Sequence, residues 1–187
     1  MEKDERYDDI KPMLKRNKIR TFRDIFKYVP KSVVAIDLGK EKRRFSQLID
    51  LPGGFKVKNI IRLVELCNIT IIEMAILIEA GYPKDKKELN KQKDDRYDVI
   101  RSRFDDGKIT LLENIFDRIP KSKVAEDIKR KPDRFAYLVD HDVQNFYVKD
   151  IIAIGRLCDL TIPEMFQLVE AQYAKQNKNL SCPEYQP

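Results

Sequence analysis

The chain has 187 residues and a formal net charge of +6 at neutral pH. Charged residues are plentiful, but Ile, Leu, Val and Phe recur throughout, so the composition excludes a disordered protein. No apolar run approaches the roughly 20 residues that cross a bilayer. Because the N-terminus is also polar and acidic, we expect a cytoplasmic protein with no membrane partner.

The sequence contains an internal duplication. Residues 4–80 align with residues 94–171 with about 33 identities in about 77 positions and one inserted residue near His141. Such a period is typical of two copies of one folded unit. We predict a first repeat over 1–82, a linker over 83–93, a second repeat over 94–173 and a polar, frayed tail over 174–187. The charged linker is either solvated or a continuation of the helix before it.

Helical spacing of apolar residues predicts an all-α fold for both repeats. In the first repeat it predicts a helix or turn over 7–14 and helices over 21–28, 32–38, 41–49 and 57–67. Thr70 and Glu73 have the spacing of a capping box, which Thr161 and Glu164 repeat. We therefore expect the last helix of the first repeat to begin at Thr70.

Residue types that commonly carry catalysis or bind metals form no recognisable motif in this sequence. Cys67 and Cys158 occupy equivalent apolar positions, where cysteine behaves as a small buried hydrophobe, and Cys182 lies in the tail. His141, the one histidine, stands at the inserted position and is expected in a loop. There is no glycine-rich phosphate loop or nucleophile motif. We therefore expect that the protein is not an enzyme. We also expect no cofactor, no metal site and no small-molecule substrate.

The excess positive charge belongs to the first repeat. Residues 1–90 contain 20 Lys and Arg against 14 Asp and Glu, whereas residues 91–187 contain 17 of each. Between Lys40 and Arg62 there are seven basic and two acidic residues. This cluster suits a polyanion such as nucleic acid. The alternative is an ordinary solvated helix face.

The segment KSVVAIDLGKEKRRFSQLI, residues 31–49, has the spacing of a helix-turn-helix motif. Ala35 provides the small residue between the two helices, and Gly39 fits the tight turn and the end of the first helix. With the following FKVKNIIRLVELCNITIIEM, the unit resembles the lambda-repressor-like (Cro and phage-repressor) family of DNA-binding domains. The resemblance covers Thr21–Ile78 and Leu112–Val169. It departs from the family in the second repeat, where Lys129 replaces the turn glycine and Pro132 enters the second helix.

The resemblance implies that residues 41–49 form a recognition helix in a major groove of double-stranded DNA. With Phe45 and Leu48 buried, the residues facing outward to read bases are Lys42, Arg43, Ser46 and Gln47. Flanking residues suited to phosphates are Lys40, Arg44, Lys56 and Lys58. The corresponding candidates in the second repeat are Lys129, Arg130, Lys131, Arg134 and Tyr137, with Asp133 among them.

The sequence leaves two alternatives open. Arg44 and its equivalent Arg134 either contact phosphate or pair with a carboxylate of their own repeat, such as Asp37 or Asp127. The whole chain is either a sequence-specific transcriptional regulator or a protein-interaction module that keeps the same fold. In a hybrid of the two, the first repeat binds DNA and the second forms a homodimer.

Overall fold

The computed structural model describes residues 4–83 and 95–180. The chain divides into unit 1, residues 1–85 with 147–149, and unit 2, residues 86–146 with 150–187. Both units consist of α-helices and 3-10 helices, with no strand in the described ranges, so the all-α prediction is confirmed. No helix in these ranges is both long and apolar enough to cross a bilayer.

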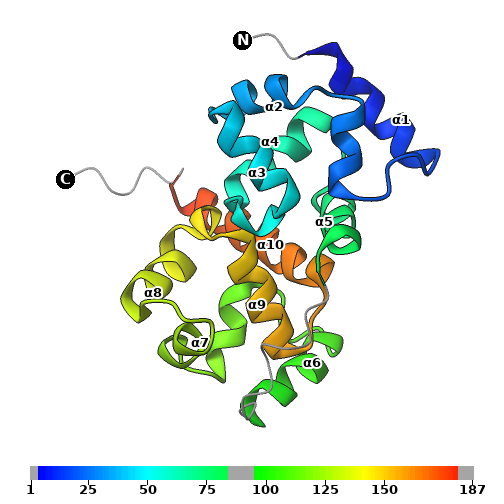
Figure 1. The fold of residues 1–187 in the computed structure, drawn as a ribbon. Coiled ribbons are helices and arrows are strands. Elements are labelled where there is room, and N and C mark those ends of the chain that lie inside the picture. Colours follow the sequence, from blue (N-terminus) through cyan, green and yellow to red (C-terminus); the bar gives the residue numbers. More distant parts are fainter. Residues whose placement is uncertain (1–3, 84–94, 181–187) are drawn as a thin grey trace. The chain divides into compact units, whose positions relative to one another are not determined.

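Unit 1 is a bundle of short helices (Figure 1). In chain order they are η1 (Glu5–Asp9), α1 (Ile10–Lys15), η2 (Phe22–Lys27), α2 (Lys31–Asp37), α3 (Lys42–Asp50), η3 (Pro52–Gly54), α4 (Val57–Cys67) and α5 (Ile71–Gly81). The bounds of α4 are as predicted. The segment predicted over 21–28 is a 3-10 helix rather than an α-helix, and the one over 7–14 divides into η1 and α1.

The core of unit 1 contains a chain of aromatic rings in edge-to-face contact. Phe45 of α3 lies 5.6 Å from Phe26 and 5.7 Å from Phe55, and Phe55 lies 5.6 Å from Phe22, measured between ring centroids. Such pairs stabilise beyond their buried area, by about 0.5–1.5 kcal/mol each. They attach α3 to η2 and to the segment before α4, which fixes the face that α3 turns to solvent.

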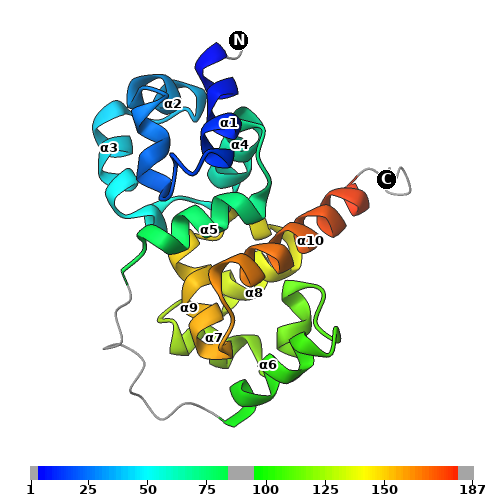
Figure 2. The ribbon, with the colours of Figure 1, turned by 90° about the vertical axis from the view of Figure 1, so that its right-hand side faces the viewer.

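Unit 2 repeats this order of elements (Figures 1 and 2). Its elements are η4 (Asp95–Tyr97), α6 (Asp98–Asp105), η5 (Leu112–Asp117), α7 (Lys121–Asp127), α8 (Pro132–His141), η6 (Val143–Asn145), α9 (Val148–Cys158) and α10 (Ile162–Leu180).

Both units contain the same local hydrogen bonds. The Thr70 hydroxyl accepts from the Glu73 amide at 3.1 Å, and the Glu73 carboxylate accepts from the Thr70 amide at 2.7 Å. Thr161 and Glu164 repeat both bonds at 3.3 Å and 2.7 Å. Both predicted capping boxes are therefore confirmed. Cys67 and Cys158 are buried and neither belongs to a disulfide, as expected.

The structure corrects the expectation for His141 and shows where the first unit's last helix ends. His141 is the last residue of α8 and not a loop residue, because the insertion lengthens this helix relative to α3. The helix α5 ends at Gly81, with Tyr82 in an extended conformation, so the helix does not continue into Tyr82. Residues 84–94 of the linker and Cys182 lie outside the described residues.

The predicted frayed tail is wrong for residues 174–180, which belong to α10. Two buried glutamines explain the extension. The Gln176 side chain donates to the Val139 carbonyl at 2.9 Å and accepts from the Val143 amide at 3.0 Å. Gln172 donates to Glu113 at 2.9 Å. The bonds of Gln176 satisfy backbone groups near the end of α8 and that of Gln172 reaches η5, so α10 is anchored beyond the point where apolar spacing stops.

Candidate nucleic-acid interface

The α2–α3 pair of unit 1 is joined by a tight turn over residues 38–41. Gly39 has φ +59°, a conformation that glycine adopts without the steric cost of a side chain. The Lys40 amide donates to the Ala35 carbonyl at 2.7 Å and the Gly39 amide donates to the Ile36 carbonyl at 2.9 Å. These bonds end α2 and direct the chain into α3. Ala35 is fully buried, as a close approach of the two helices requires.

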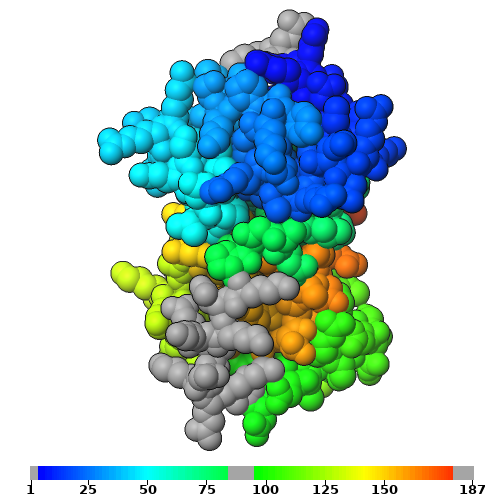
Figure 3. Space-filling view, turned by 45° about the vertical axis from the view of Figure 1, so that its right-hand side comes forward, coloured from blue at the N-terminus to red at the C-terminus, as the bar shows by residue number. Residues whose placement is uncertain are grey.

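The burial of one face of α3 determines which side chains it exposes. Phe45 and Ile49 are buried and Leu48 is half-buried. Lys42, Arg43 and Gln47 are exposed, as predicted. Ser46 is half-buried, and its hydroxyl donates to the Lys42 carbonyl at 3.1 Å. Figure 3 shows the side chains of the α3 region projecting from the surface of unit 1.

A second set of cations gathers beside α3. Partial burial lowers the pKa of Lys40, and the positive charges of Arg44, Lys56 and Lys58 lower it further. The charges of Arg44, Lys56 and Lys58 therefore act on Lys40, although the four side chains come from the α2–α3 turn, from α3 and from the start of α4. The structure therefore brings together the residues that we predicted for phosphate contacts.

Five cations of this region form no ion pair with the acids near them. Within the described ranges, no ion pair is formed by Lys40, Lys42, Arg43, Arg44 or Lys58. Asp50, one of the two acidic residues nearby, pairs instead with Arg23. The other nearby acid, Glu41, is the N-cap residue of α3 and forms no side-chain capping bond, and the first turns of α3 and α4 contain no acidic residue. Cations at a helix N-terminus are disfavoured by the helix dipole, whereas an anion is stabilised there.

The equivalent turn of unit 2 keeps its shape without a glycine. Lys129 has φ +57°, and the Arg130 amide donates to the Ala125 carbonyl at 2.6 Å, as Lys40 does to Ala35 in unit 1. A left-handed conformation costs a non-glycine residue about 1–2 kcal/mol. Pro132 is the first residue of α8, where a missing amide hydrogen is tolerated.

Arg130, which stands at the position of Lys40, is engaged within unit 2. Its Nε and a terminal nitrogen donate to Asp150 Oδ1 at 2.8 Å and 2.6 Å. The Asp150 side chain is 8% exposed, and the equivalent position in unit 1 is the neutral Asn59. Unit 2 thus carries a buried carboxylate that holds its cation, and sequence reasoning missed this pair. The sequence contained a signal for this pair, because Arg130 and Asp150 both differ from the residues at the same positions of the first repeat, Lys40 and Asn59.

The outer face of α8 combines charges of both signs with an aromatic pair. Lys129, Lys131, Asp133 and Arg134 are exposed. The Arg134 guanidinium lies 5.5 Å from the centre of the Tyr137 ring, and the His141 ring lies 5.5 Å from the same ring. Tyr137 is 49% exposed. The candidate residues of unit 2 therefore form no cationic cluster like that of unit 1.

Neither Arg44 nor Arg134 pairs with the carboxylate that we considered for it. The Tyr7 hydroxyl donates to Asp37 at 2.7 Å, and the Tyr97 hydroxyl donates to Asp127 at 2.8 Å. Burial raises the pKa of Tyr7, and this hydrogen bond to Asp37 raises it further. Both aspartates thus connect the N-terminal segment of their unit to α2 or α7. Arg44 is exposed, which leaves it available to a partner.

Comparisons with protein-family models, curated proteins and solved structures gave no match. The resemblance to repressor domains therefore stays a prediction from the residues of this chain.

Proposed function

We propose that unit 1 is a lambda-repressor-like helix-turn-helix domain that binds double-stranded DNA, and that the chain is a transcriptional regulator. The observation that carries this proposal is the cationic cluster around α3 and the start of α4. Within it Lys40 is partly buried beside the charges of Arg44, Lys56 and Lys58. Lys40, Lys42, Arg43, Arg44 and Lys58 form no ion pair within the described ranges. The cations repel one another and oppose two helix dipoles, and a phosphate backbone relieves both effects.

The exposed side chains of α3 supply the chemistry for reading bases. Arg43 and Lys42 present donors suited to guanine O6 and N7, and Gln47 presents the donor and acceptor pair suited to adenine. Each good bidentate contact discriminates by about 1–3 kcal/mol. Lys40, Arg44, Lys56 and Lys58 would position the duplex through its phosphates without reading its sequence.

Fluorescence anisotropy of a random-sequence duplex tests this proposal. Lys42→Glu/Arg43→Glu in unit 1 is compared with a matched charge reversal in unit 2, Lys131→Glu/Arg134→Glu. We expect the first variant to lose most of the affinity and the second to retain more of it. The plot of log K against log salt should become shallower, because two cations that face the duplex are replaced by anions. A wild-type chain that ignores duplex DNA at low salt, or equal loss in both variants, contradicts the proposal.

A protein-contact role is the second candidate function, and the surface of α8 favours it for unit 2. Its central aromatic side chain, Tyr137, is half exposed, and its Lys40 equivalent is held by Asp150. Tyrosine and arginine are both enriched at protein interfaces. If unit 2 forms a homodimer through this surface, Tyr137→Ala should convert a dimer to a monomer in sedimentation analysis. An unchanged oligomeric state in this variant excludes the α8 interface.

A further inference from the structure

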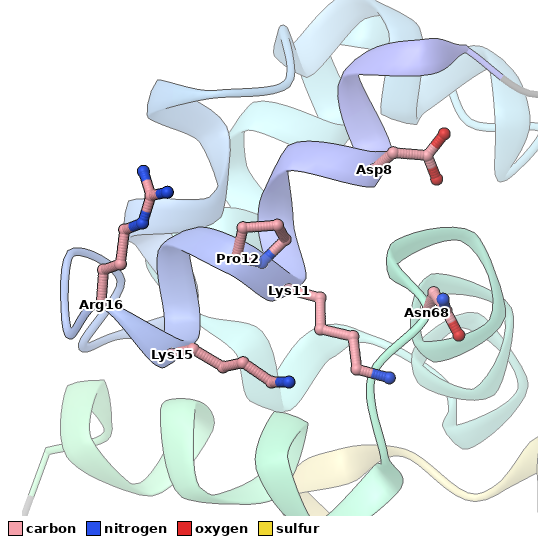
Figure 4. A pocket seen from close by; sticks show the side chains of 6 residues that line it. All are labelled: Asp8, Lys11, Pro12, Lys15, Arg16 and Asn68. Atoms are coloured by element: carbon pink, nitrogen blue, oxygen red, sulfur yellow. The ribbon is translucent and has the colours of Figure 1, made fainter.

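A second group of cations lies in unit 1, on α1. A surface pocket of about 490 Å³ is lined by Asp8, Lys11, Pro12, Lys15, Arg16 and Asn68. In Figure 4, Lys11 and Lys15 extend from α1 toward the segment that carries Asn68, and Arg16 extends on the other side of the helix. Lys15 and Arg16 are exposed and Lys11 is half-buried. None of these three cations forms an ion pair within the described ranges.

Unit 2 has the opposite charge at the same place. Arg101, Asp105, Asp106 and Asp159 occupy the positions of Lys11, Lys15, Arg16 and Asn68. The Arg101 guanidinium donates to Asp105 at 2.8 Å and to Glu164 at 2.9 Å, so it is neutralised within unit 2. Because unit 2 forms the equivalent helix with aspartates at these positions, the fold does not require the cations of α1.

The pocket on α1 is separate from the cationic cluster around α3. Figures 1 and 2 place α1 and α3 on different sides of unit 1. A duplex lying along α3 therefore leaves the pocket uncovered. Pro12 is its one apolar lining residue, whereas pockets for small molecules are lined mainly by apolar side chains. The three cations outnumber the one carboxylate of the lining, Asp8, and with the amide of Asn68 they suit the oxygens of a phosphodiester backbone.

We propose that the α1 pocket contacts the phosphate backbone of a second nucleic-acid segment, so that unit 1 holds two segments on different sides. This inference rests on the proposed DNA-binding function of α3 for its first segment. The pocket itself can be tested whether or not α3 binds DNA.

The experiment compares four chains by anisotropy of a short random-sequence duplex over a range of salt concentrations. They are the wild type, the α3 variant Lys42→Glu/Arg43→Glu, the pocket variant Lys15→Asp/Arg16→Asp, and the combination of both. The pocket variant introduces the residue types that unit 2 carries at the equivalent positions, so we expect it to fold, and circular dichroism checks this. A matched reversal of two exposed cations of unit 2, Lys108→Asp/Arg118→Asp, controls for net charge.

We expect the combined variant to bind more weakly than the α3 variant, with a salt slope shallower by up to about 1.8. In a capture assay, wild-type protein on an immobilised duplex should retain a second, labelled duplex. The pocket variant should bind the immobilised duplex and lose the second. The control variant should retain both.

Three results would overturn the inference. The first is equal affinity with and without the pocket substitutions in both backgrounds. The second is an equal loss in the control variant, which would indicate a general effect of net charge. The third is binding of pyrophosphate, abolished by the pocket variant, with no change in duplex binding, which would assign the pocket to a small phosphate. If the α3 substitutions leave duplex affinity unchanged while the pocket substitutions lower it, the proposed function of α3 fails and the pocket is the DNA contact.

Discussion

The ion pair between Arg130 and Asp150 gives the sharpest prediction about unit 2. Arg130→Ala removes a guanidinium that is 34% exposed and leaves a carboxylate that is 8% exposed without its two hydrogen bonds. Breaking a fully buried pair costs about 3–5 kcal/mol. Water can reach this site through the exposed side of Arg130, so we expect a smaller cost of about 2–3 kcal/mol.

Asp150→Asn should cost less, about 1 kcal/mol, because the amide oxygen still accepts a hydrogen bond and the guanidinium is partly hydrated. For a domain of this size, each kcal/mol lowers the melting temperature by about 4–8 °C. Arg130→Ala should therefore lower the melting temperature of unit 2 by about 10 °C or more. Scanning calorimetry and urea unfolding followed by circular dichroism measure both variants. A larger cost for Asp150→Asn than for Arg130→Ala would refute the reasoning.

The same position in unit 1 should respond in the opposite way. Lys40 forms no ion pair within the described ranges, and its neighbours are cations. Lys40→Ala should leave the free energy of unfolding unchanged or slightly raised, because it removes repulsion. It should weaken duplex binding and make the salt slope shallower by about 0.9. A destabilised Lys40→Ala with unchanged DNA affinity would assign Lys40 to the fold.

Further predictions concern backbone geometry, a buried glutamine and pH. Gly39→Ala should cost about 1 kcal/mol in urea unfolding through φ alone, because no atom lies within 4 Å of the added Cβ. Lys129→Gly should change the free energy of unfolding by less than Gly39→Ala does, because the relief of backbone strain is offset by the greater backbone entropy of glycine in the unfolded chain. Gln176→Ala should cost about 2 kcal/mol, because it leaves a buried carbonyl and amide unsatisfied. The ion pair with Lys27, followed by hydrogen bonds from Arg20 and Thr21, lowers the pKa of Asp24. Its stabilisation should be complete above about pH 4 and decline as pH falls further. Asp24→Asn should therefore cost about 1 kcal/mol at neutral pH, as for loss of a helix cap, and the cost should disappear in acid.

The local elements could be predicted because their signals are local. Apolar spacing placed α4 correctly, and the Thr70–Glu73 pair marked the start of α5. The repeat showed which positions the fold needs, since both copies keep the tyrosine and aspartate that bond in each unit. The extension of α10 could not be predicted, because it depends on Gln176 reaching backbone groups 33 and 37 residues away.

The exposed face of α3 and the cations beside it were predictable, whereas the ion pairs of the equivalent residues in unit 2 were not. One helix face follows from which residues are buried, so Lys42, Arg43 and Gln47 could be assigned from the expected burial of Phe45 and Leu48. Ion pairs depend on contacts between separate elements. The engagement of Arg130 by Asp150 across 20 residues required the structure.

Backbone amide NMR during titration with a short duplex tests the central claim most directly. We predict that the largest shifts occur in residues 40–47 and 56–58, at the first turns of α3 and α4, and that residues 129–137 of unit 2 shift far less. Bound duplex with residues 40–47 unchanged, or shifts centred on α8, would contradict DNA binding by the first unit.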